Sequence, residues 1–271
     1  MTQLRIGGAP GTCVLHNGKW VIEAEPHIMM RLKRVFGSVG RRAYGKIQMS
    51  DTAANCRDLA WFVQRYPMEV TPRDHLENRA REHEERENIV RDLLAAKIAP
   101  REFKLKFPPR DYQKLAADVA LRSGGLLLCD DLGLGKTVTA IAMLTEPSTR
   151  PALVVAPTHL QRQWRDEIGK FAPNLETHIL KKGTPYDYSR SGRSNQLALI
   201  KPHPDVLITT YHKLPGWADT LAHVVKSVVY DEVQELRGGL MRNGKAIQKN
   251  AAAQHISQRV DYRLGLTATP I

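Results

Sequence analysis

Residues 130–137 carry side chains suited to binding an anion. They read Asp-Asp-Leu-Gly-Leu-Gly-Lys-Thr and follow an apolar run. A buried strand that enters a glycine-rich turn and continues as a helix aims backbone N–H groups and the helix N-terminus at one point. We interpret the segment as a phosphate-binding loop, in which Lys136 neutralises the β- and γ-phosphates and Thr137 ligates Mg²⁺. Asp130 stands where the strict pattern has its first glycine, so an ordinary glycine-rich turn is the alternative.

Two adjacent carboxylates end a second apolar run. Asp231 and Glu232 directly follow residues 228–230, far downstream of Lys136. At the end of a strand the chain turns, so both side chains can reach one site. Asp231 is suited to holding Mg²⁺ through water, and Glu232 to orienting and deprotonating an attacking water. A solvated strand end is the alternative for an Asp-Glu pair taken alone.

Short apolar runs position these residues. They alternate with helical stretches through the C-terminal part of the chain and cover residues 126–130, 152–156, 206–209, 228–230 and 264–267. Runs that are apolar on both faces predict strands of a covered parallel sheet. Open α/β sheets bind ligands beyond the carboxyl ends of their strands. The loops after these strands are therefore where we expect the chemistry.

Three more segments complete a recognisable set of motifs. Residues 152–167 read ALVVAPTHLQRQWRDE, residues 205–214 read DVLITTYHKL, and residues 263–271 read RLGLTATPI. With DDLGLGKT and DEVQ, they resemble motifs Ia, Ib, III, I and II of superfamily-two helicases. Residues 152–167 are similar in particular to motif Ia of the Swi/Snf-like branch of ATP-dependent DNA translocases, which carries Pro, Leu, Gln-Trp and Glu at this spacing.

This resemblance implies a RecA-like lobe over residues 105–271 that binds ATP and Mg²⁺. Residues 105–113, LKFPPRDYQ, resemble the adenine-recognition motif of the family. The implied nucleotide-binding residues are Arg110, Gln113, Asp131, Gly133, Leu134, Gly135, Lys136, Thr137 and Val138. The implied catalytic residues are Lys136, Asp231 and Glu232, with Thr137 and Asp231 as the Mg²⁺ ligands.

The same resemblance assigns residues to DNA contact and to coupling. Thr158, Gln161 and Tyr211 lie in the motifs that contact nucleic acid. The implied coupling residues are Gln234, Thr267 and Thr269. Gln234 departs from the His that the branch usually has, and we expect coupling between hydrolysis and DNA movement to differ accordingly.

Residues 1–104 predict a separate small α+β accessory domain. A hairpin is expected around Asn17 and Gly18, then a helix over 26–36 and a strand over 45–49. Asp51 or Thr52 is expected to cap the next helix, and residues 74–98 form a long charged helix.

Basic side chains of this domain are candidates for contact with nucleic acid. They are Arg31, Lys33, Arg34, Arg41, Arg42 and Lys46, with no acid between them and with Phe36 and Tyr44 interleaved. The layout resembles the accessory domain of HepA-related annealing helicases. A packing domain with a solvated basic face is the alternative.

Composition restricts the class of protein. A net charge of +12 and a pI near 9.7 favour a polyanionic partner. No apolar run approaches a membrane span and no signal segment is visible, so we expect a soluble intracellular protein, cytoplasmic or associated with the nucleoid or nucleus. The three cysteines have no metal-like spacing and are expected to be buried.

The sequence therefore predicts the ATP-binding half of an ATP-dependent double-stranded DNA translocase or helicase that remodels or reanneals DNA. The chain stops at Ile271, directly after motif III. The resemblance implies a second RecA-like lobe, on another chain or missing, whose arginines complete the site, so turnover without it is expected to be weak. Two alternatives stay open: a non-catalytic DNA-binding module that keeps the fold, and the motor subunit of a restriction or defence complex.

Overall fold

The computed structural model describes residues 10–36, 45–188, 203–238, 241–242 and 245–269. The chain forms two compact units, Met1–Ile89 and Val90–Ile271. Their division falls within the long helix α3 (Arg73–Leu94). The boundary between residues 104 and 105 stays a prediction.

The first unit contains a four-stranded sheet in the order β3-β2-β1-β4. Its strands are β1 (Gly11–His16), β2 (Lys19–Ala24), β3 (Ile47–Ser50) and β4 (Glu69–Thr71), and its first two helices are α1 (Pro26–Val35) and α2 (Ala53–Arg65). Asn17 and Gly18 both adopt positive φ, 47° and 69°, which turns β1 tightly into β2. The predicted hairpin is confirmed.

The start of α2 resolves the choice between two predicted caps. The hydroxyl of Thr52 accepts a hydrogen bond from Asn55 N at 3.2 Å, so Thr52 is the cap. Asp51 accepts instead from Trp20 Nε1 at 3.0 Å and pairs with His75 Nε2 at 2.9 Å. Strand β4 was not predicted, and α3 ends at Leu94 rather than at residue 98.

The second unit is built on a six-stranded parallel sheet, as predicted for a RecA-like α/β lobe. The strand order is β5-β12-β9-β6-β8-β7. The strands are β5 (Gly125–Leu128), β6 (Ala152–Ala156), β7 (Thr177–Ile179), β8 (Val206–Thr210), β9 (Ser227–Asp231) and β12 (Tyr262–Leu266). Five of these match the predicted apolar runs, and β7 was not predicted.

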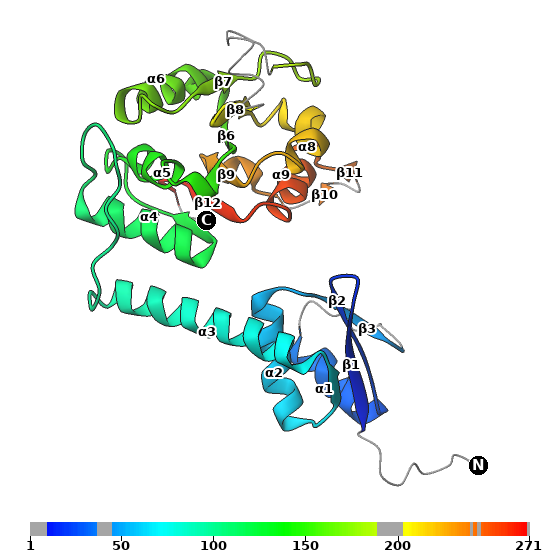
Figure 1. Ribbon diagram of the computed structural model, residues 1–271. Helices are drawn as coiled ribbons and strands as arrows, with labels where there is room; N and C mark the ends of the chain where they lie inside the picture. Colours follow the sequence, from blue (N-terminus) through cyan, green and yellow to red (C-terminus); the bar gives the residue numbers. More distant parts are fainter. Residues whose placement is uncertain (1–9, 37–44, 189–202, 239–240, 243–244, 270–271) are drawn as a thin grey trace. The chain divides into compact units, whose positions relative to one another are not determined.

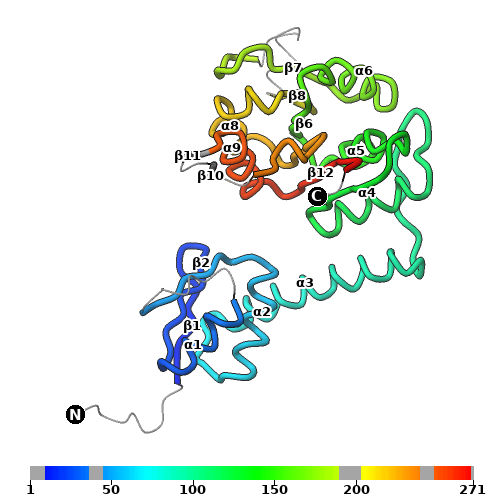
Figure 2. The backbone as a smooth tube through the Cα atoms, turned by 180° about the vertical axis from the view of Figure 1, so that it is seen from behind, coloured from blue at the N-terminus to red at the C-terminus, as the bar shows by residue number. Residues whose placement is uncertain are grey.

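Helices cover both faces of this sheet (Figure 1). Helices α4 (Asp111–Ser123), α5 (Lys136–Leu144) and α6 (Gln161–Phe171) share one core with Val154, and helices α8 (Leu214–Ala222) and α9 (Gln248–Ser257) share the other with Leu153 and Val155. Successive side chains of β6 thus enter opposite cores, which explains why its sequence is apolar throughout. Figure 2 shows the same arrangement from behind.

Short elements complete the second unit. They are the 3-10 turns η1 (Pro147–Thr149), η2 (Thr158–Leu160) and η3 (Val233–Leu236), and the strand pair β10 (Met241–Arg242) and β11 (Lys245–Ala246). Within the described residues, no helix is long and apolar enough to cross a membrane.

The edge of the sheet corrects two expectations: that the strand predicted over residues 126–130 is covered on both faces, and that all three cysteines are buried. Leu127 on β5 is 53% exposed, and Cys129, just beyond this strand, is also exposed. Among the strands that the structure describes, β5 pairs only with β12, so it is less covered than the central strands. The expectation that all three cysteines are buried is therefore wrong for Cys129 and holds for Cys13 and Cys56.

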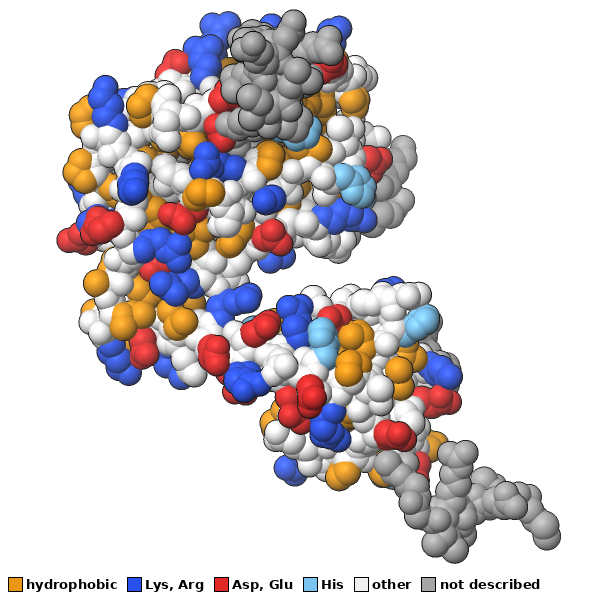
Figure 3. All heavy atoms as spheres, viewed as in Figure 1, with side chains coloured by type: hydrophobic (Ala, Val, Ile, Leu, Met, Phe, Trp, Pro, Cys, Tyr) orange, Lys and Arg blue, Asp and Glu red, His pale blue; other side chains and the backbone are white. Residues whose placement is uncertain are grey.

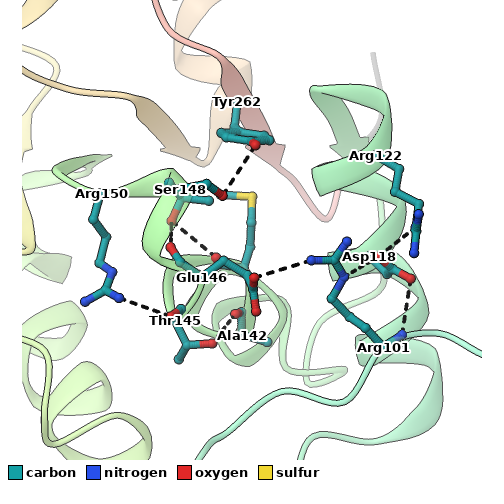
Figure 4. A network of polar contacts seen from close by, with 11 residues as sticks. Arg101, Asp118, Arg122, Ala142, Thr145, Glu146, Ser148, Arg150 and Tyr262 are labelled. Atoms are coloured by element: carbon teal, nitrogen blue, oxygen red, sulfur yellow. Dashed lines mark hydrogen bonds and ion pairs between the residues drawn. The ribbon is translucent and has the colours of Figure 1, made fainter. Parts of the chain in front are cut away.

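A buried ionic network fixes the segment that leads into α4 (Figure 4). Asp118 is fully buried and accepts hydrogen bonds from Arg101 Nε at 2.7 Å and Arg122 Nε at 3.1 Å. Arg101 also donates to Glu146, at 3.3 Å. A buried carboxylate needs such partners because leaving it unpaired is strongly destabilising. The network holds the segment against α4 and the end of α5, and α4 carries Gln113 toward the candidate site.

Candidate functional site

Three chain segments, which follow β5, β6 and β9, meet in one cavity of about 330 Å³ at the carboxyl ends of the parallel strands. Six predicted site residues line it: Gly133, Gly135, Lys136, Thr137, Asp231 and Glu232. The first four follow β5, Asp231 is the last residue of β9, and Glu232 is the N-cap of η3. The cavity therefore places the candidate phosphate-binding loop opposite the candidate acids.

The loop after β5 has the backbone expected of an anion site. Gly133 and Gly135 adopt positive φ, 84° and 75°, and Gly135 is the N-cap of α5. A Cβ on Gly133 would meet no atom within 4 Å, so the loop is open on this side. Helix α5 begins at Lys136, which directs its first N–H groups toward the loop.

Lys136 folds back onto its own loop. Its Nζ donates to the backbone oxygens of Asp130 at 2.7 Å and Asp131 at 3.0 Å. These carbonyls are neutral acceptors, and an ammonium bonds more strongly to an anionic oxygen. Lys136 is thus held at the cavity by contacts that a phosphate can replace.

Gln113 supports the loop through hydrogen bonds to its backbone. Its Nε2 donates to the backbone oxygens of Leu134 at 2.9 Å and Gly135 at 3.4 Å, while its Oε1 accepts from Arg110 N at 2.9 Å. Tyr112 OH also donates to Leu134 O, at 2.8 Å. The side chain of Gln113 is buried and fully engaged, and neither it nor Arg110 lines the cavity. Their contact with adenine stays a prediction.

Asp231 is held by two donors from neighbouring elements. Trp164 Nε1 donates to its Oδ2 at 2.7 Å, and Tyr211 OH donates to its backbone oxygen at 2.8 Å. Burial raises the pKa of the Asp231 carboxyl, the hydrogen bond from Trp164 opposes this, and the charge of Glu232 adds to the rise.

A chain of hydrogen bonds links the ends of β9 and β12. Gln234 Nε2 donates to Glu232 Oε2, and Thr267 Oγ1 donates to Gln234 Oε1 at 2.8 Å. Thr269 N donates to Thr267 Oγ1 at 3.0 Å. Glu232 itself lies in the left-handed region, at φ 53°, a conformation that few non-glycine residues adopt. The three predicted coupling residues therefore contact one another next to Glu232.

Leu132, which was not among the predicted site residues, lies in the predicted loop and also lines the cavity. Sequence reasoning missed three further lining residues outside that loop: Leu160, Gln163 and Trp164. They follow β6, which lies directly beside β9 in the sheet. Their place after a parallel strand was the available signal, because loops at this edge converge. Asp131, Leu134 and Val138 were also predicted to bind nucleotide, and they do not line the cavity.

The predicted nucleic-acid residues are spread over both units. Thr158 lies in η2, while Gln161 is only 9% exposed and Tyr211 only 3%. On α1, Arg31 and Arg34 are exposed and Lys33 is half-buried. Arg41 and Arg42 lie outside the described residues. Contact of these side chains with DNA stays a prediction.

Comparison with known proteins decides the family. The model of the SNF2-related domain matches residues 54–271, which is most of the chain. The chain belongs to the SNF2-related family. Among its relatives, the transcription regulatory protein SNF2 of Saccharomyces cerevisiae is 30% identical over 151 residues, and the ATP-dependent helicase FUN30 of the same yeast is 30% identical over 158 residues.

These matches each cover 54% of the chain, and only 8% of SNF2 and 13% of FUN30. The SNF2-related chain therefore spans a small part of these relatives. A solved structure titled Sulfolobus solfataricus SWI2/SNF2 ATPase core in complex with dsDNA matches with 26% identity and a TM-score of 0.49, covering 64% of this chain and 34% of that one.

The close approach of Gln113 to Gly135 leads to a testable prediction for the loop of residues 130–137. A Cβ on Gly135 would lie 2.5 Å from Gln113 Nε2, whereas one on Gly133 would be in open space. Both glycines have positive φ, so each Gly→Ala change should cost about 1–2 kcal/mol of backbone strain. Gly135→Ala should destabilise the lobe further, by about 1–3 kcal/mol, because it displaces a buried donor.

Urea denaturation of the two variants measures this difference. Adding Gln113→Ala to Gly135→Ala should recover part of the extra loss, since the two residues are in contact. Equal losses for Gly133→Ala and Gly135→Ala would contradict the proposed support of the loop by Gln113.

Proposed function

We propose that the chain is the ATP-binding half of an ATP-dependent motor that moves on double-stranded DNA and remodels or reanneals it. The observation that carries this proposal is the cavity shared by Lys136 and Thr137 on one side and Asp231 and Glu232 on the other. Membership of the SNF2-related family supports it. A second RecA-like lobe that completes the nucleotide site is part of the proposal.

The residues around the cavity suit a Mg²⁺–ATP complex. The Thr137 hydroxyl and the Asp231 carboxylate are hard oxygen donors of the kind that Mg²⁺ prefers. Mg²⁺ bound there would neutralise charge on the phosphates. The open side of Gly133 leaves room beside the loop, and the N–H groups at the start of α5 provide donors for phosphate oxygens.

We assign the hydrolytic step to Glu232. Its carboxylate is available to orient a water and accept a proton from it, while Lys136 moves from the carbonyls of residues 130 and 131 to the phosphates. Gln234 holds one oxygen of Glu232, and Thr267 holds Gln234. We infer that this chain of contacts transmits structural changes between Thr267, in motif III, and the catalytic acid Glu232.

Double-stranded DNA is the polymer that the family relationship favours. Lys and Arg side chains are spread over the visible face of the second unit, with Asp and Glu among them (Figure 3). The distribution of charge on this face therefore does not by itself identify a binding path for DNA. We place one contact in the accessory domain proposed for residues 1–104, where Arg31 and Arg34 of α1 are exposed and the helix carries no acid.

Lys136→Ala tests the nucleotide site. We expect Mg²⁺–ATP affinity, measured by calorimetry, to fall at least roughly tenfold, because a hydrogen bond to a charged group contributes about 1.5–3 kcal/mol. Lys170→Ala on α6 is the matched control, since Lys170 is exposed and does not line the cavity. Equal affinity in the wild type and Lys136→Ala would overturn the assignment of the loop.

The double variant Arg31→Ala/Arg34→Ala tests the DNA contact of α1. We expect weaker binding to duplexes of any sequence, with the slope of log K against log salt reduced by up to about 2, because each phosphate contact contributes about 0.9. The double variant Arg81→Ala/Arg86→Ala on the acid-rich helix α3 removes the same charge as a control. An unchanged salt slope would favour a solvated basic face.

A further inference from the structure

The carboxylate of Asp231 has a neutral hydrogen-bond donor as its partner. Trp164 is only 2% exposed and donates its indole Nε1–H to Asp231 Oδ2 at 2.7 Å. Tyr211 OH donates to the backbone oxygen of the same residue at 2.8 Å. Both the side chain and the main chain of Asp231 are therefore restrained before any ligand binds.

The sheet explains how Trp164 reaches Asp231. Trp164 lies on the first turn of α6, which follows β6, and β6 pairs with β9 through Val155 and Tyr230. The residue after Tyr230 is Asp231, so the indole extends from one strand end to the end of the adjacent strand. Its ring packs in the core that α6 shares with α5 and the sheet, which fixes the direction of the N–H.

An indole suits this position chemically. It can only donate a hydrogen bond, and it carries no charge that would neutralise Asp231 or repel a cation. A Lys or Arg in its place would pair with the carboxylate and compete with a metal for it. A neutral donor orients the carboxylate and leaves its negative charge available to a cation in the cavity.

We propose that Trp164 is a positioning residue that orients the Asp231 carboxylate for Mg²⁺ bound with nucleotide. This proposal rests on the proposed function, because it concerns the same site. It also links motif Ia to the catalytic centre: any displacement of the start of α6 relative to β9 changes the contact between Trp164 and Asp231. The first residue of α6, Gln161, is a predicted DNA contact.

The test compares Trp164→Phe with Trp217→Phe in the full chain. Phe keeps the aromatic packing and removes only the N–H. Trp217 is also fully buried in the second unit and donates its indole N–H to Lys182 O at 2.9 Å, so it is a matched control that does not line the cavity. Calorimetry measures affinity for the non-hydrolysable analogue AMP-PNP, once with Mg²⁺ and once with EDTA.

We expect Trp164→Phe to weaken Mg²⁺-dependent binding by about 10- to 100-fold, the usual effect of losing a partner of a metal ligand. Binding in EDTA should be unchanged, and Trp217→Phe should match the wild type in both conditions. In an Asp231→Asn background, Trp164→Phe should have no further effect on binding, because its action passes through the carboxylate.

NMR of the indole groups gives a readout independent of nucleotide. The indole N–H signal that disappears in Trp164→Phe should be the one that shifts in Asp231→Asn. Equal losses with Mg²⁺ and with EDTA, an undiminished effect in the Asp231→Asn background, or an unmoved indole signal would each overturn the positioning role while leaving the nucleotide site intact. A wild-type chain without Mg²⁺-dependent binding would overturn the proposed function and, with it, the role of Trp164.

Discussion

The register between β5, β12 and β9 is the constraint on which the candidate site depends. Leu266 of β12 lies opposite Leu128 of β5 on one side and opposite Asp231 of β9 on the other. The three strands therefore end at the same level, and Thr267 N donates to Leu128 O at 3.1 Å just beyond them. A shift of one residue would move the loop, the acids or Thr267 away from the shared edge.

Polar groups at this edge are held by contacts with one another. Lys136 contacts carbonyls of its own loop, Gln113 contacts the carbonyls of residues 134 and 135, and Trp164 contacts Asp231. Burying these groups without partners would cost free energy, so the site is ordered before it is filled. Ordering in advance leaves less conformational entropy to lose when a ligand binds.

The central strands were predictable because the sheet buries both of their faces. β6 and β8 are buried at every position, and their sequences are correspondingly apolar or Thr. β7 is half-buried and reads Thr-His-Ile, which gives no such pattern, and the three-residue β4 gives little more. Burial on both faces makes a strand apolar throughout, and this is the pattern by which β6 and β8 could be predicted.

Contacts between distant segments were not predictable in the same way. The loop from 130 to 137 and the acid pair could be chosen from residue types and spacing, and the structure brings them to one cavity. The bond from Trp164 to Asp231 joins separate strands, and no local pattern encodes its geometry. The hydrogen bond from Tyr211 OH to the backbone oxygen of Asp231 is a second contact of this kind, and the assignment of Tyr211 to DNA contact stays a prediction.

The structure of the chain with AMP-PNP and Mg²⁺ tests the central claim most directly. The account predicts phosphates at the N-terminus of α5, Lys136 Nζ moved from the carbonyls of residues 130 and 131 to a phosphate oxygen, and Mg²⁺ between Thr137 and Asp231. A nucleotide bound elsewhere, with Lys136 still on those two carbonyls, would contradict it.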